Sequence, residues 1–319
     1  MDYVTLGKTG LVVSRACLGA GGSSRLGLRR GATPDEVMRL VGRAIELGVT
    51  LFDTAPRYGT ESLIGQAVAS RRNDLVISSK LSCVLGADMN STDLCSAEDA
   101  RKQVEASLVA LKTDRIDILH LHGVRPHQFE HCQDVLLPEL VRLREAGKVR
   151  FLGVTESFGN DPDHVTARRT IANPEFGVLM LGLNIVNHSL TRTVLPATRA
   201  HGVGVMNMFA VRGALAQRDA IATLVAQLIA SGEVDPADVD QNDPLGFLLE
   251  PGVAGSLTEA AYRYCRHTPG IDVVMFGTGN IEHLEQNIGS ILGPPLPKPA
   301  LRQISNAFGK VISATGTIH

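Results

Sequence analysis

The chain has 319 residues, 44% of them hydrophobic and 20% charged, which is enough for one large barrel or for two ordinary domains. A net charge of −2, without a basic run longer than two residues, argues against nucleic acid and anionic membranes as partners. The five cysteines are scattered without C-x-x-C spacing, so neither a disulfide framework nor a metal site is expected. Because the chain shows no secretion signal and no run of about 18 apolar residues, we expect a cytoplasmic protein without a membrane span.

Short apolar runs alternate with helical patterns along most of the chain, which is typical of repeated βα units around a parallel sheet. The first two runs, 3–6 and 11–14, flank Gly7-Lys8-Thr9-Gly10 and predict a small hairpin outside that series. The eight strands that follow are predicted at Arg15–Gly19, Val49–Asp53, Leu75–Lys80, Ile116–His122, Arg150–Thr155, Gly177–Leu183, Val203–Asn207 and Val273–Thr278.

The predicted helices carry clear start signals. Thr33-Pro34-Asp35-Glu36 combines an N-cap, a proline at the first helical position and a capping-box glutamate, and Ser256 to Glu259 repeats the capping pattern. Further helices are predicted over 62–69, 97–111, 135–146, 163–172, 189–201, 217–231 and 281–291, with a short helical rhythm after Pro299. Eight strand–helix units predict a (β/α)8 TIM barrel with an N-terminal β-hairpin, forming a single domain over 1–319. A doubly wound sheet stays possible, although no G-x-G-x-x-G follows the first strand.

Two loop regions attract attention. The segment 211–255 is longer than a βα connection needs, and a lid or substrate loop is as compatible with it as a surface elaboration without a role. The glycine-rich loop at 21–31 contains Arg25, Arg29 and Arg30, which could receive an anionic substrate or simply be solvated.

Polar side chains stand at the carboxyl ends of three successive predicted strands. Asp53 ends the second strand with Tyr58 in the turn after it, Lys80 ends the third strand and His122 the fourth. Because the carboxyl ends of barrel strands converge on one face, we expect these side chains to meet. A buried lysine paired with an aspartate stays charged and would lower the pKa of a neighbouring phenol, so Tyr58 is a candidate proton donor. Each residue alone is more often structural; their joint placement favours a catalytic site.

The sequence resembles the aldo-keto reductase family. The three segments that match its catalytic motifs are Asp53–Gly59, Ile77–Lys80 and Asp114–His122, while Leu6–Gly19, Phe151–Thr155 and Gly277–Asn287 match its N-terminal hairpin and first strand, its fifth strand and its nucleotide-binding segment. The resemblance covers residues 1 to about 310 and is weakest across 211–255.

This resemblance implies an NAD(P)H-dependent oxidoreductase that transfers a hydride between nicotinamide and an aldehyde, ketone or sugar lactol. Tyr58 would act as general acid/base, Lys80 paired to Asp53 would tune it, and His122 would orient the carbonyl; no metal is required. The residues that the resemblance assigns to the cofactor are Gly19, Ala20, Asp53, Thr155, Glu156, Met180, Asn207, Met208, Ala210, Thr278, Gly279, His283, Gln286 and Asn287.

The nicotinamide contacts depart from the family pattern. Thr155-Glu156 stands where many relatives have Ser-Asn, Met180 aligns with a glutamine, and Asn207 aligns with a stacking tyrosine unless the alignment slips by one or two residues there. A 2′-phosphate calls for Arg or Lys at close range, and the segment Gly277–Asn287 supplies neither. Because members of this family commonly use NADP, the resemblance favours NADP as the cofactor, and NAD is also possible.

Two other functions remain open at this stage. A cofactor-binding regulatory or interaction protein with little turnover would be compatible with the altered nicotinamide contacts. A Schiff-base lyase using Lys80 as nucleophile fits the spacing of Tyr58 less well. For the leading interpretation, the expected partner is a small carbonyl or sugar substrate.

Overall fold

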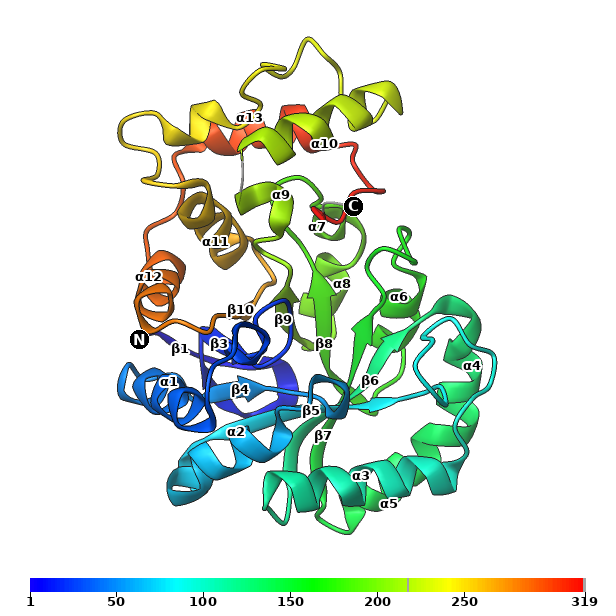
Figure 1. Cartoon of the computed structure of the whole chain (residues 1–319). Helices are drawn as coiled ribbons and strands as arrows, with labels where there is room; N and C mark the ends of the chain where they lie inside the picture. The colour runs from blue at the N-terminus through cyan, green and yellow to red at the C-terminus, as the bar shows by residue number, and fades with distance from the viewer. Residues whose placement is uncertain (217, 318–319) are drawn as a thin grey trace.

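The computed structural model describes residues 1–216 and 218–317. Its centre is a closed barrel of parallel strands in the order β10-β3-β4-β5-β6-β7-β8-β9 (Figure 1). The strands are β3 Ala16–Gly19, β4 Leu51–Asp53, β5 Val76–Ser82, β6 Ile116–Val124, β7 Val149–Glu156, β8 Phe176–Gly182, β9 Gly204–Met208 and β10 Val273–Phe276. Strands β1 (Tyr3–Thr5) and β2 (Val12–Ser14) pair antiparallel outside the barrel. The predicted (β/α)8 barrel with an N-terminal hairpin is therefore confirmed.

Helices surround the barrel, and most lie where the sequence predicts them. The α-helices are α1 Pro34–Glu46, α2 Glu61–Val68, α3 Ala97–Leu111, α4 Phe129–His131, α5 Leu137–Glu145, α6 Val165–Ile171, α7 Leu190–Thr193, α8 Leu195–Ala200, α9 Gly213–Ala216, α10 Arg218–Ala230, α11 Leu257–His267, α12 Ile281–Ile291 and α13 Lys298–Phe308. Position 217, where one predicted helix begins, lies outside the described residues.

The helix predicted over 189–201 is wrong as a continuous element. It is interrupted at Val194, which caps α7 and α8 with a φ of −119°, and Pro196 follows in the first turn of α8. Proline has no N–H to donate back to the preceding turn, so it favours a new start there. The predicted helix over 135–146 likewise begins later, at α5, after a π-helical segment, Cys132–Leu136.

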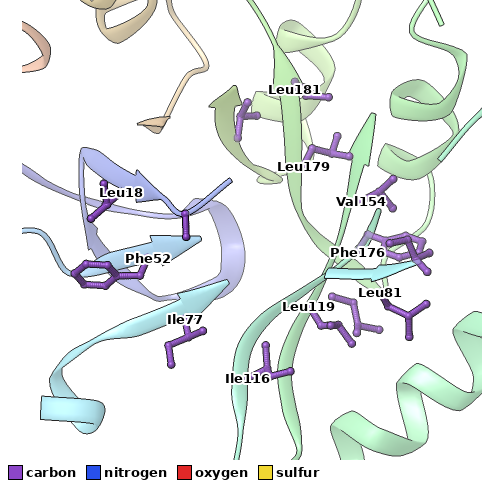
Figure 2. Close-up of a cluster of buried hydrophobic side chains, with 14 of the residues drawn as sticks. Leu18, Phe52, Ile77, Leu81, Ile116, Leu119, Val154, Phe176, Leu179 and Leu181 are labelled. Atoms are coloured by element: carbon purple, nitrogen blue, oxygen red, sulfur yellow. The ribbon is translucent and has the colours of Figure 1, made fainter. Parts of the chain in front are cut away.

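Alternation along the strands divides the barrel residues into two sets. One set, which includes Leu18, Phe52, Ile77, Leu119, Val154 and Leu179, packs with apolar residues of the surrounding helices. Figure 2 shows these buried side chains on their strands. Residues one position away, including Cys17, Leu51, Ile118, Val178 and Met206, form a separate cluster inside the barrel. The period of two therefore decides which side chains can reach a site in the barrel interior.

The hairpin closes the amino-terminal end of the barrel. Leu6, Leu11 and Val13 belong to the apolar cluster of the barrel interior. Gly204, at the start of β9, lies so close that an added Cβ would come within 2.7 Å of Leu6 Cγ. The opposite, carboxyl-terminal face is therefore the end of the barrel that the hairpin leaves open.

The segment 211–255 contributes to a second apolar cluster beside the barrel. Helix α10 lies next to α13 on one side of the molecule (Figure 1), and Ile221, Leu228 and Val234 are buried with Ile304 and Phe308. Within the described residues, no helix combines the length and apolarity that crossing a membrane requires.

Candidate active site

Asp53, Lys80 and His122 all point into the carboxyl-terminal end of the barrel. Asp53 ends β4, and Lys80 and His122 continue the inward-facing sets of β5 and β6. Tyr58 lies in the short 3₁₀ turn η3 (Pro56–Tyr58), which Gly59 ends with a φ of +70°. Glycine adopts this left-handed conformation without penalty, so the turn can bring the phenol back over the barrel.

Lys80 and Asp53 form a buried ion pair. Lys80 Nζ lies 2.6 Å from both carboxylate oxygens of Asp53 and donates a third hydrogen bond to the carbonyl of Thr54 at 2.9 Å. The two side chains are 1% and 3% exposed. Burial has the largest single effect and lowers the pKa of Lys80, but the charges of Asp53 and Tyr58 and their hydrogen bonds together outweigh it, and the pKa of Lys80 is raised. Lys80 is therefore a permanent cation beneath the phenol.

Tyr58 lies between this cation and His122. The Tyr58 hydroxyl is 3.5 Å from His122 Nε2, and Lys80 Nζ is 4.9 Å from the centre of the phenol ring. Burial, followed by the charges of Lys80 and Arg57, lowers the pKa of His122 to about 3, so its ring is neutral at physiological pH. A neutral imidazole can offer one N–H to an oxygen atom without adding charge.

The phenol differs in one respect from the sequence-based expectation. Lys80 does lower the pKa of Tyr58, but burial has the larger effect and the net shift is upward. Because a phenolate would lose its hydration here, the protonated form is favoured in the free protein. Tyr58 therefore keeps its proton at neutral pH.

The predicted nicotinamide contacts fall on both faces of the sheet. Thr155 and Met180 continue the inward-facing sets of β7 and β8, and Met208 packs with the interior cluster. Glu156 is one residue further along β7 and faces outward, where it binds His164 Nδ1 at 2.9 Å. Asn207 is fully buried, and its amide nitrogen donates to the carbonyl oxygens of Leu183 and Met208. The structure therefore brings Thr155, Met180 and Met208, but not Glu156 or Asn207, to the barrel interior.

The remaining predicted cofactor residues lie around the ends of β3, β9 and β10. Gly19 ends β3, and the backbone N–H of Ala20 donates to the carbonyl of Asp53 at 2.7 Å. Ala210 is buried after β9. Gln286 and Asn287 lie further along α12, where the Gln286 amide binds the side chain of Glu282. Of the predicted cofactor residues in the segment Gly277–Asn287, Thr278, Gly279 and His283 line an open space.

That space is a cavity of about 680 Å³ between the loop after β3 and the start of α12, which we call the β3–β10 cavity. Its floor is backbone, because an added Cβ on Gly279 would lie 2.3 Å from Gly27 Cα. Asn280 caps α12 by accepting from the N–H of His283, and the first N–H groups of the helix point toward the same region. A helix N-terminus above a glycine floor fits a phosphate group.

The two arginines of the β3–β10 cavity come from a part of the chain that the sequence did not connect with the cofactor site. Arg30 and Arg39 line it, together with Glu36 and Glu282. Arg30 follows the glycine-rich loop and Arg39 lies on α1, more than 200 residues before α12. The N-cap at Thr33 predicted where α1 begins, but only the closure of β10 against β3 brings α1 beside α12.

Residues 311–317, close to the end of the chain, cross the carboxyl-terminal face of the barrel near β8 and β9. Asn187 donates to the carbonyls of Ile312 and Ala314 at 3.0 and 2.9 Å, and Asn184 donates to that of Thr315 at 3.2 Å. Arg212 contacts the Thr317 hydroxyl and stacks over the ring of Phe209, 3.5 Å from its centre. We call residues 311–317 the tail strap; it forms part of the wall around the open end of the barrel.

Comparison with known proteins agrees with this geometry. The family model described as "Aldo/keto reductase family" matches residues 17–307. L-galactose dehydrogenase of Arabidopsis thaliana is 28% identical over 311 residues, covering 91% of this chain and 88% of that protein. An aldo-keto reductase of Bacillus subtilis is 25% identical over 321 residues, covering 91% and 89%. The holo structure of an aldo-keto reductase from Bacillus halodurans aligns with a TM-score of 0.70 at 20% identity, covering 99% of this chain and 98% of that one.

The barrel and the family match together define the class: the chain belongs to the aldo/keto reductase family. Membership makes it an oxidoreductase that uses a nicotinamide cofactor, NAD(P)H, and acts on a small carbonyl compound.

Proposed function

We propose that the protein is an NADPH-dependent reductase of an aldehyde, ketone or sugar lactol, with Tyr58 as general acid/base. The observation that carries this proposal is the cluster of Asp53, Lys80, Tyr58 and His122 at the open end of the barrel. The relative named L-galactose dehydrogenase supports a sugar as one substrate class. A reducing cytosol is our proposed location, since all five cysteines are free.

In this mechanism the protein binds the carbonyl oxygen and supplies a proton to it. NADPH supplies the hydride when it is bound. The Tyr58 hydroxyl donates its proton to the oxygen as negative charge develops there, and the Lys80 cation stabilises the phenolate that remains. His122, with its neutral ring, donates a hydrogen bond to the same oxygen and fixes its position. Asp53 holds Lys80 in place and keeps it charged.

The β3–β10 cavity is our candidate for the phosphate and adenosine portion of the cofactor. Thr278, Gly279 and the N-terminus of α12 would hold phosphate groups, and Thr155, Met180 and Met208 would surround the nicotinamide. Arg30 and Arg39 support NADPH over NADH, because a 2′-phosphate needs cations at close range. Glu36 and Glu282 oppose this preference, so some use of NADH is expected.

Cofactor choice is tested by titrating the purified protein with NADPH and, separately, NADH, following nicotinamide fluorescence. We expect NADPH to bind more tightly, and the variants Arg30→Ala and Arg39→Ala to lose on the order of tenfold in NADPH affinity with little change for NADH. Arg29→Ala is the matched control, since Arg29 is an exposed neighbour that does not line the cavity. Equal affinity for both cofactors, unaffected by either variant, would show that the cations do not select the phosphate.

Activity is tested with a carbonyl panel and the variant Tyr58→Phe. Loss of one donor from such a site costs on the order of 10² to 10³ in kcat, so Tyr58→Phe should bind NADPH normally but turn over poorly. A regulatory role on the same barrel is the second candidate, because the outward-facing Glu156 and Asn207 leave the nicotinamide fewer polar contacts. Tight NADPH binding by the wild-type protein with no turnover of any carbonyl would favour that role.

A further inference from the structure

The loop after β3 returns across Tyr58 before it reaches the β3–β10 cavity. An added Cβ on Gly21 would lie 2.7 Å from Tyr58 Cε2, so the backbone of the loop rests directly on the phenol ring. Six residues later, Gly27 packs against Gly279 at the floor of the cavity. Residues 22–26 are therefore fixed at both ends. Gly21 contacts the Tyr58 ring at one end, and Gly27 contacts Gly279 at the other.

Arg25 occupies this span in an unusual conformation. Arg25, Leu26 and Gly27 have φ values of +46°, +58° and +93°, three consecutive residues in the left-handed region. For the two residues with side chains this costs about 1 kcal/mol or more each, and it persists only where the surroundings hold it. Leu26 supplies such an anchor, because its side chain is 1% exposed and packs in the main apolar cluster. The strained turn thereby fixes the position of Arg25.

The Arg25 side chain has no partner within the described part of the chain. It is half-buried, yet it makes no hydrogen bond or ion pair among residues 1–216 and 218–317. It does not line the β3–β10 cavity, although Ser23, Ser24 and Gly27 on either side of it do. Its charge nevertheless acts on Tyr58, whose pKa it lowers. Because Gly21 of the same loop contacts the phenol ring, Arg25 lies on the loop that covers Tyr58, and its guanidinium is available to a ligand.

A second guanidinium reinforces the positive charge at this point. Arg57 donates to the Ser82 hydroxyl and to the carbonyls of Gly86 and Ala87, so its position is set by neutral acceptors. Its charge lowers the pKa of His122. Asp53, which also acts on Tyr58, is neutralised by Lys80. Two cations that have no carboxylate partner among the described residues therefore lie on the loops around Tyr58 and His122.

We propose that the physiological substrate is a carbonyl compound bearing an anionic group, a carboxylate or a phosphate, and that Arg25 binds this group beside the carbonyl that Tyr58 protonates. This inference rests on the proposed reductase activity and narrows its substrate class. The positive charge of Arg57, whose position is fixed by its hydrogen bonds, also favours a negatively charged group at the open end of the barrel. Arg25 is then a specificity-determining residue, since a neutral carbonyl compound would leave its guanidinium without a partner.

The test compares matched anionic and neutral aldehydes. The pairs are 4-carboxybenzaldehyde with 4-nitrobenzaldehyde, and glyceraldehyde 3-phosphate with glyceraldehyde, so that carboxylate and phosphate are examined separately. We expect Arg25→Ala to raise KM for at least one anionic aldehyde by on the order of 10- to 100-fold, with less than about threefold change for its neutral partner. Arg25→Lys should recover part of the loss, and Arg29→Ala should behave as wild type. Added salt should reduce the preference for the anion.

Two results would overturn the inference while leaving the reductase proposal intact. One is an equal effect of Arg25→Ala on the anionic and neutral members of both pairs; the other is an increased Kd for NADPH in this variant, which would make Arg25 a cofactor residue. If the wild-type protein reduces no aldehyde, binding of 4-carboxybenzoate to the NADPH complex is measured by fluorescence quenching. Binding that depends on Arg25 then supports the inference although the reductase proposal fails; its absence overturns both.

Discussion

Tyr58 and His122 have opposite pKa shifts, and together they determine how activity should depend on pH. Burial raises the pKa of Tyr58 above its ordinary value of 10.0, whereas burial and nearby cations lower that of His122 to about 3. A proton donor with a raised pKa remains protonated until the pH exceeds that pKa. A histidine with a lowered pKa is neutral at every pH above it. Neither group changes charge in the neutral range.

Carbonyl reduction should therefore show a flat pH profile. We expect kcat/KM for reduction to be constant from about pH 5 to about pH 9 and to fall only as the pH rises through the pKa of Tyr58. The reverse oxidation needs the phenolate and should become faster over that same alkaline range. Initial rates with a neutral aldehyde and saturating cofactor measure this. An inflection between about pH 6 and pH 7 would mean that His122 titrates there and is less buried during the reaction than in the free protein.

At the scale of single residues, the sequence predicted the cluster of acid, phenol, lysine and histidine because three of them lie near the carboxyl ends of strands and Tyr58 lies in the turn after one. A strand end is defined by a short apolar run, and parallel strands in a barrel bring such ends together whatever their separation in the chain. The prediction placed Glu156 beside Thr155 at the nicotinamide, but adjacent residues of a strand face opposite sides. For Asn207, a shift of one residue is enough to exchange it with the inward-facing Met208.

At the scale of elements, β6 and β7 meet at an unusually close contact. His120 is fully buried inside the barrel, below His122, and its ring nitrogens have no hydrogen-bond partner in the described structure. Its ring fits only because Gly153 on β7 has no side chain. A Cβ there would lie 2.5 Å from His120 Nδ1 and 2.7 Å from the carbonyl oxygen of Val178. The close packing of β6, β7 and β8 at this point therefore requires a glycine at position 153.

Gly153→Ala should destabilise the barrel. Because the added methyl group meets both a fixed ring and a backbone oxygen, we expect the free energy of unfolding to fall by about 1 to 3 kcal/mol, measured by urea denaturation. Gly42→Ala on α1 is the control: no atom lies within 4 Å of its added Cβ, and alanine is the better helix former. Adding His120→Ala to Gly153→Ala should recover part of the loss. Wild-type stability for Gly153→Ala would contradict the packing described.

The boundaries of the elements were predictable where local signals decide them. The helices predicted over 97–111 and 281–291 match α3 and α12, whose N-caps are Ser96 and Asn280. The division into α7 and α8 was missed because the apolar rhythm continues across Val194, although Pro196 was a visible signal for a new start. Long-range packing could not be predicted in this way, because nothing in the sequence around Arg39 indicates that this residue lies beside α12.

At the scale of the whole molecule, the segment 211–255 and the C-terminus stabilise one another. Glu233 follows α10 and accepts hydrogen bonds from the backbone N–H groups of Ile312 and Ser313 at 2.8 and 3.1 Å. The same strap is held from the barrel by Asn184 and Asn187. No local signal in the sequence predicts this contact, because Glu233 and Ile312 are 79 residues apart in the chain, and whether the tail folds over the site could not be predicted either.

Glu233→Ala should loosen the tail strap without unfolding the barrel. The variant removes acceptors for two backbone N–H groups while the barrel contacts of Asn184 and Asn187 remain. We therefore expect faster hydrogen–deuterium exchange at residues 311–317, with a small change in Tm. Asp238→Ala, an exposed acidic residue of the same segment, serves as control. If exchange in the strap is unchanged in Glu233→Ala, the asparagine contacts alone are sufficient to hold it.

The N-terminal hairpin has a consequence for the order of events during turnover. Leu6, Leu11 and Val13 close one end of the barrel, so the proposed cofactor and substrate would both have to enter from the carboxyl-terminal face. Whichever of them lies deeper must arrive first and depart last. For the proposed reaction we therefore expect a compulsory order of binding in steady-state kinetics, with release of the deeper molecule limiting the number of cycles per second.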